Sequence, residues 1–169
     1  MSQLSPELFS EAQKYLSTPQ DKLVNDVATI LSRIAVGDSI SDYSFVVSPI
    51  SKAYEGYLKD FFLKLHIIDD ESYNSDRFRV GKTLNPSLRY KRFSIFQKLA
   101  DFDEKGEDLA EQLWDAWKYG RNEIFHYFPN SVKAIDRQAA EDRIYMVLNA
   151  IIKSGEFYKL HSRNIDTEF

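Results

Sequence analysis

Apolar residues recur at helical spacing along most of this chain. Between Leu23 and Ile34 they fall three or four residues apart, so that they share one face of a helix. A serine or threonine followed by proline marks several helix starts, because the hydroxyl caps the first turn and proline suits its geometry. These signals predict helices over residues 6–16, 19–36 and 48–66.

The second half of the chain predicts three further helices. They begin near Pro86, after Gly106 and after Asp136, and the last of them should end at Gly155. Residues 69–86 lose the helical period and contain asparagine, glycine and proline, which predicts a loop or a short hairpin. The whole pattern predicts an all-α bundle of about five to six helices, in a single domain over residues 1–169.

The amino-acid composition indicates the cellular compartment and excludes several kinds of site. The sequence contains no cysteine, which excludes disulfides, thiolate catalysis and cysteine-based zinc sites and is typical of a reducing compartment. The first residues have neither a basic start nor an apolar run, and charge interrupts every later apolar stretch before about 18 residues. We therefore expect a cytoplasmic protein with no membrane partner.

Charge is distributed unevenly, although the net charge is only −4. The stretch from 77 to 98 has seven basic residues and no acidic one, whereas acidic residues dominate the remainder. Such a stretch can bind an anionic ligand, or it can be a solvated basic loop, and composition leaves both open. The seven basic residues are Arg77, Arg79, Lys82, Arg89, Lys91, Arg92 and Lys98.

The clearest chemical signal lies late in the helix that begins after Gly106. Within about two helical turns, Arg121, Asn122 and His126 supply a guanidinium, a carboxamide and an imidazole. Arginine can stabilise a phosphate that gains charge in a transition state, and histidine can move a proton near neutral pH. On a straight helix, however, Arg121 points about 140° away from His126, so either the helix end is distorted or two chains contribute to one cleft.

These residues resemble the motif of the HEPN superfamily, whose ribonucleases carry an arginine, commonly followed by asparagine, and a histidine a few residues later. A second segment, residues 51–62, resembles the helix of RNase LS toxins that contributes a functional glutamate, which here would be Glu55. The resemblance covers about residues 48–155. The larger RNase LS toxins carry extra domains that we do not expect in this chain, so their antitoxin and mode of control are not carried over.

The resemblance implies a homodimeric helical bundle that cuts RNA without a metal or another cofactor, as a toxin or in phage defence, with an antitoxin protein as a further partner. In this interpretation Arg121 stabilises the transition state and His126 transfers protons. Asn122 orients the imidazole or the phosphate, and Glu55 acts as a base or holds Arg121. The residues expected to bind RNA are Arg77, Arg79, Lys82, Arg89, Lys91 and Arg92. The alternative is a non-catalytic HEPN-type dimeric module that binds RNA, a nucleotide or a partner protein.

Overall fold

The computed structural model describes residues 4–126, 129 and 133–165. This part of the chain contains eight α-helices, one 3-10 turn and one π-helical turn but no β-strand, which confirms the predicted all-α class. The elements are α1 (Pro6–Gln13), α2 (Thr18–Arg33), α3 (Ser44–Lys64), α4 (Asp70–Asn74), α5 (Val80–Thr83), η1 (Pro86–Leu88), α6 (Ile95–Ala100), α7 (Gly106–Trp117), η2 (Lys118–Asn122) and α8 (Arg137–Ile165).

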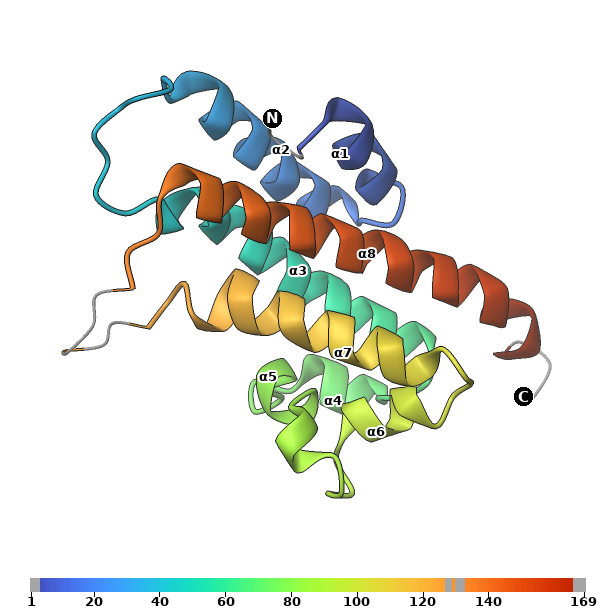
Figure 1. Ribbon diagram of the computed structural model, residues 1–169. Coiled ribbons are helices and arrows are strands. Elements are labelled where there is room, and N and C mark those ends of the chain that lie inside the picture. Colours follow the sequence, from blue (N-terminus) through green and yellow to red (C-terminus); the bar gives the residue numbers. More distant parts are fainter. Residues whose placement is uncertain (1–3, 127–128, 130–132, 166–169) are drawn as a thin grey trace.

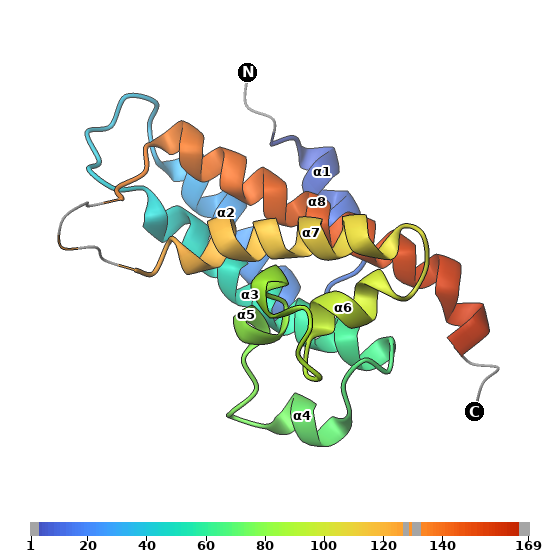
Figure 2. The same cartoon turned by 60° about the horizontal axis from the view of Figure 1, so that its bottom comes forward.

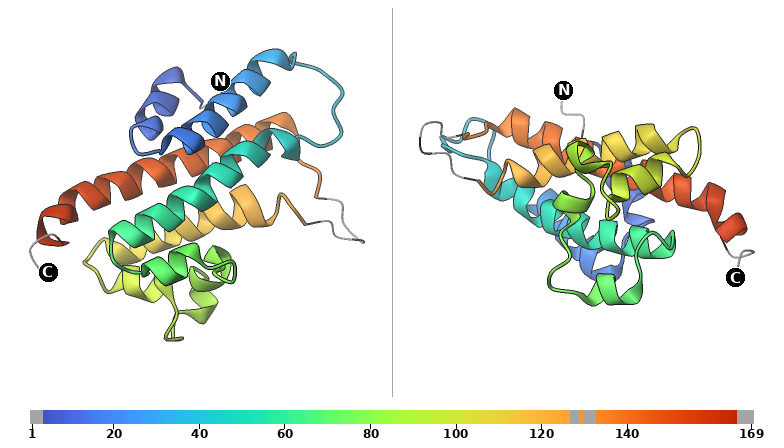
Figure 3. Two further views of the ribbon diagram at one scale, coloured as in Figure 1. Left: turned by 180° about the vertical axis from the view of Figure 1, so that it is seen from behind. Right: turned by 90° about the horizontal axis from the view of Figure 1, so that it is seen from below.

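Three long helices, α3, α7 and α8, form the centre of the bundle (Figure 1). The helices α1 and α2 cover α3 and α8 on one side, whereas α4, α5 and α6 lie on the opposite side, next to α7 and the end of α3 (Figures 2 and 3). One cluster of buried apolar residues extends from Ala12 to Phe157, so the elements share a single core. Within the described ranges, no helix combines the length and the apolar character needed to cross a membrane.

The side chains of α3 explain its central position. Most of its apolar residues are buried, and two of its tyrosine hydroxyls donate hydrogen bonds to the backbones of neighbouring helices. Tyr54 donates to the carbonyl of Leu113 on α7 at 3.0 Å, and Tyr57 donates to the carbonyl of Ile151 on α8 at 3.1 Å. Because a buried hydroxyl without a partner is costly, these bonds hold α3 in one position relative to both helices.

Several helix boundaries differ from the prediction, and two of these differences have a clear structural reason. The helix α3 begins at Ser44 rather than at residue 48, and Pro49 lies inside it. The earlier start is stabilised by Asp42, whose carboxylate accepts the backbone N–H of Ser44 at 3.0 Å. The helix α8 continues well past Gly155. This glycine packs against the ring of Tyr15 instead of ending the helix.

The prediction of a loop or hairpin over residues 69–86 was wrong, because this segment forms the short helices α4 and α5 and then η1. Asp69 caps α4 by accepting a backbone N–H at 2.7 Å, and Asn85 caps η1 in the same way at 2.9 Å. Such local caps allow helical turns to form where hydrophobic periodicity is lost. The helix expected from Pro86 onward is also interrupted, since α6 begins only at Ile95. The bundle therefore has more helices than predicted.

Candidate functional site

A π-helical turn carries the first two residues of the motif. The helix α7 continues directly into η2, which includes Arg121 and Asn122. Here the N–H of Glu123 donates to the carbonyl of Lys118 at 3.0 Å, five residues back instead of the four of an α-helix. Turns of this type are rare and occur frequently at functional sites. The helix end is therefore distorted, which was one of the two alternatives drawn from the sequence.

Side chains from the core helices α3 and α8 stabilise η2. Arg143 on α8 donates from Nη1 to the carbonyl of Tyr119 at 2.6 Å, and the buried hydroxyl of Ser51 on α3 donates to the carbonyl of Gly120. Gly120 lies so close to α8 that a Cβ atom there would be 2.5 Å from Cγ2 of Val147. The π turn forms here because its neighbours satisfy its carbonyls and because a glycine permits the close approach.

Arg121 is held by a carboxylate and two aromatic rings. Its Nε and Nη2 atoms donate to the same oxygen of Glu55, Oε2, at 3.0 and 2.8 Å. The guanidinium also lies 4.8 Å from the ring centroid of Trp117 and 5.6 Å from that of Phe125. Both charged side chains remain about one-third exposed, at 33% for Arg121 and 32% for Glu55. The guanidinium is thus fixed in orientation while part of it still faces solvent.

His126 lies beyond the end of η2 and is exposed. Its Nε2 donates to Oδ1 of Asn122 at 3.1 Å, so the carboxamide orients the imidazole. A shallow cavity of about 180 Å³ lies beside this histidine. Its lining residues are Asp42, Ser44, Glu123, Ile124, Phe125, His126, Lys133 and Ala134.

Two carboxylates form part of the wall of this cavity. Asp42 is partly desolvated, which raises its pKa, but hydrogen bonds from Ser44 and from the N–H of Ile135 outweigh this effect and lower the pKa below its ordinary value. Glu123 lies 3.6 Å from the guanidinium of Arg143 and 3.9 Å from the amine of Lys133. Neither carboxylate could be identified from the sequence, because Asp42 comes from a distant segment and neither residue belongs to a recognisable motif.

The structure brings the four predicted site residues together as two pairs. Glu55 contacts Arg121, and Asn122 contacts His126, but the described lining of the cavity beside His126 does not include Arg121. Trp117 is a core residue, since this side chain is only 6% exposed. Its second role, as a platform for the guanidinium, could not be read from helical spacing.

The six predicted RNA-binding residues differ in their surroundings. Arg89 forms an ion pair with Glu107 at 2.8 Å and donates to Gln97 at 2.9 Å, so its charge is used to join η1, α6 and α7. Arg79 is exposed, and its guanidinium donates to the nearby carbonyls of Asp76 and Phe78. The other four are exposed: Arg77, Lys82, Lys91 and Arg92.

The described residues include no group of three or more histidine, cysteine, aspartate or glutamate side chains that could hold a metal ion. Comparison with known protein families, with curated proteins and with solved structures gives no match. The functional interpretation therefore depends on the geometry of η2 and of the side chains around it.

Proposed function

We propose that the protein is a metal-independent endoribonuclease with a site formed by Glu55, Arg121, Asn122 and His126. The observation that supports this most directly is the fixed guanidinium of Arg121, which lies in the same short segment as an exposed histidine. An arginine held in this way is preorganised for a phosphate, because little side-chain freedom is left to lose when the phosphate binds.

The proposed reaction is attack by a 2'-hydroxyl of RNA on the adjacent phosphorus. A bond forms from the 2'-oxygen to phosphorus while the bond to the 5'-oxygen of the next nucleotide breaks, leaving a 2',3'-cyclic phosphate and a 5'-hydroxyl. His126 transfers the proton from the attacking 2'-hydroxyl to the leaving 5'-oxygen, and proton transfer of this kind is typically worth about 10² to 10⁴ in rate. The Nε and Nη2 atoms of Arg121 bond to Glu55, so we assign the contact with the phosphorane oxygens to Nη1. DNA is not cut because it lacks the 2'-hydroxyl.

The proposal includes a homodimer. Arg121 and His126 belong to two separate pairs in one chain, and a second copy related by a two-fold axis would place a pair from each chain on one cleft. The proposed biological role is that of a toxin or phage-defence ribonuclease, which an antitoxin protein can inhibit. Growth arrest after induction, absent when His126 is replaced by alanine, is the expected result in cells.

The direct test is cleavage of a labelled RNA by the purified protein in the presence of EDTA. Arg121→Ala and His126→Ala should each lower the rate at least about 10²-fold. Lys22→Ala, an exposed cation on α2, serves as the control and should leave the rate unchanged. Product analysis should find cyclic phosphate ends. Cleavage that stops in EDTA and returns with magnesium, or that persists in His126→Ala, would contradict the proposal.

A second candidate is a non-catalytic dimeric module that binds RNA, a nucleotide or a partner protein. The engagement of Arg121 by Glu55 favours it, because the same ion pair could serve only to hold the fold together. Under this alternative, intact RNA would be recovered after long incubation, and Arg121→Ala would lower the melting temperature without any change in the RNA.

A further inference from the structure

The basic segment, residues 77–98, lies next to the motif in space. Gly81 of α5 packs against the indole of Trp117, so closely that a Cβ atom at this position would collide with it. The same indole lies beneath the guanidinium of Arg121, at 4.8 Å from the ring centroid. One tryptophan therefore separates the basic segment from the proposed catalytic arginine.

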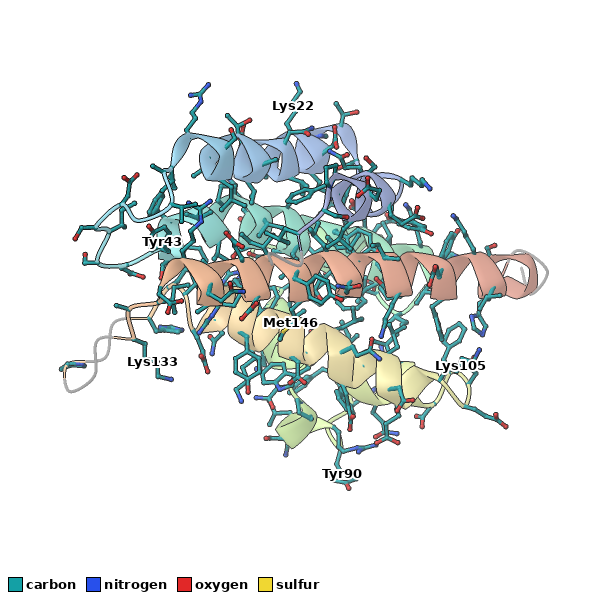
Figure 4. All side chains as sticks on the ribbon, turned by 45° about the horizontal axis from the view of Figure 1, so that its top comes forward. Lys22, Tyr43, Tyr90, Lys105, Lys133 and Met146 are labelled. Atoms are coloured by element: carbon teal, nitrogen blue, oxygen red, sulfur yellow. The ribbon has the colours of Figure 1, made fainter. Side chains whose placement is uncertain are left out.

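Two basic residues lie between two aromatic ones on the outer part of this segment, where the chain reads Tyr90-Lys91-Arg92-Phe93. Tyr90 is 90% exposed and stands at the outer tip of the molecule (Figure 4). Phe93 is 41% exposed, and Nζ of Lys82 lies 4.9 Å from its ring centroid. Two exposed rings so close together in the chain form a candidate binding surface.

The cations of this segment are available to a ligand. Lys82, Lys91 and Arg92 are exposed and form no ion pair within the part of the chain that the structure describes. No acidic residue occurs between residues 77 and 98, whereas the remainder of the chain has an excess of acidic residues. The positive potential is therefore local, and it lies beside the proposed site.

We infer that this surface binds a single strand of nucleic acid, with unpaired bases stacked on Tyr90 and Phe93 and phosphates contacting Lys82, Lys91 and Arg92. The inference rests on the proposed function, since the strand would be the RNA substrate on its way past Trp117 to Arg121. Stacking on aromatic rings accepts any base, because every base has a π-face. A duplex does not fit, because its bases are already stacked on one another.

None of the proposed contacts reads the 2'-hydroxyl. Single-stranded DNA should therefore occupy it and compete with RNA, although DNA is not cut. Binding selects for an unpaired strand at the basic segment, while the choice of RNA is made by the chemistry at Arg121 and His126.

The test measures binding in a His126→Ala background, so that the probe is not cleaved. The probe is a fluorescent single-stranded RNA of about twelve nucleotides, followed by anisotropy. The double variant Tyr90→Ala, Phe93→Ala should weaken binding at least about 25-fold, because each stacked base contributes about fivefold or more. Val36→Ala, which truncates an apolar residue that is 90% exposed elsewhere, should have no effect.

Rescue, salt and competition complete the test. Tyr90→Trp should retain the affinity of the parent, because an indole also stacks on bases. Lys91→Gln with Arg92→Gln should flatten the dependence of log Kd on log salt by about 0.7 for each lost contact. Unlabelled single-stranded DNA should displace the probe at concentrations similar to those of single-stranded RNA, whereas duplex RNA should require much more.

Unchanged RNA affinity in the double alanine variant, or stronger competition by duplex RNA, overturns the inference. Loss of self-association in that variant with unchanged RNA affinity also overturns it, and identifies the surface as a protein contact. The proposed function fails separately: strong binding that depends on Tyr90 and Phe93, together with no cleavage by the unmodified chain, would reject the nuclease and leave the strand-binding surface in place.

Discussion

Replacing Gly120 by alanine tests how closely the π-helical turn approaches α8. Alanine is favoured over glycine in a helix by about 1 kcal/mol. The added Cβ atom, however, would lie 2.5 Å from Cγ2 of Val147, which is about 1 Å inside an ordinary contact between carbon atoms. Overpacking of this kind costs about 1 to 3 kcal/mol. We therefore expect Gly120→Ala to lower the free energy of unfolding by about 1 kcal/mol.

The sign of this effect should reverse when Val147 is truncated. Val147 is fully buried, so Val147→Ala alone should cost about 2 kcal/mol, from lost burial and the cavity that remains. In that background the alanine at position 120 meets no Cγ2 atom and partly fills the space. It should then stabilise the protein by about 1 kcal/mol, from helix propensity and one buried methyl group.

Urea unfolding of the four proteins in this cycle measures the coupling directly. The two substitutions should interact by about 2 kcal/mol, well outside the roughly 0.5 kcal/mol within which independent sites add. Equal effects of Gly120→Ala in both backgrounds would refute the close approach of η2 to α8. Because Arg121 follows Gly120 directly, RNA cleavage should fall in the single variant and recover in the double variant.

Three further predictions concern stability. Gly155→Ala should lower the urea midpoint, because its Cβ atom would collide with the ring of Tyr15, and in a Tyr15→Ala background the same change should raise it. Burial raises the pKa of Tyr54 and Tyr57 well above the usual value near 10, so stability should hold below about pH 10 and fall above it, with the tyrosinate absorbance of these two residues appearing only on unfolding. Asp42→Ala should lower the free energy of unfolding by about 1 kcal/mol at neutral pH. Because the pKa of Asp42 is lowered, the free energies of unfolding of the variant and of the unmodified chain, measured in urea, should converge as the pH falls through that pKa, below 3.8.

The long helices could be predicted from sequence because helical periodicity depends on local spacing. The ends of these helices could not be predicted, because the residue types that often start or end a helix can also lie inside one and make packing contacts. Glycine often ends a helix, yet Gly155 lies inside α8, where the ring of Tyr15 leaves no room for a side chain. Proline often occupies the first turn of a helix, yet Pro49 lies inside α3. This helix begins earlier, where the carboxylate of Asp42 accepts the N–H of Ser44.

The candidate site could also be predicted only in part. Arg121, Asn122 and His126 are close in the chain, so residue type and spacing were sufficient to select them. The π turn was not predictable, because its carbonyls are satisfied by Ser51 and Arg143, which lie 69 and 24 residues away in sequence. The contact of Glu55 with Arg121, over 66 residues, was anticipated only through a resemblance and not from spacing.

The five-residue ring of η2 also limits how this gene segment can change over generations. Loss of one codon within residues 118–122 would let α7 continue as a regular α-helix, and residues inside the turn would then be displaced by about 100° around the helix axis relative to the residues that follow it. Arg121 could then face Glu55, or His126 could keep its place, but not both. We expect natural selection to accept many substitutions in this segment while removing insertions and deletions, so that the number of residues between the arginine and the histidine stays constant.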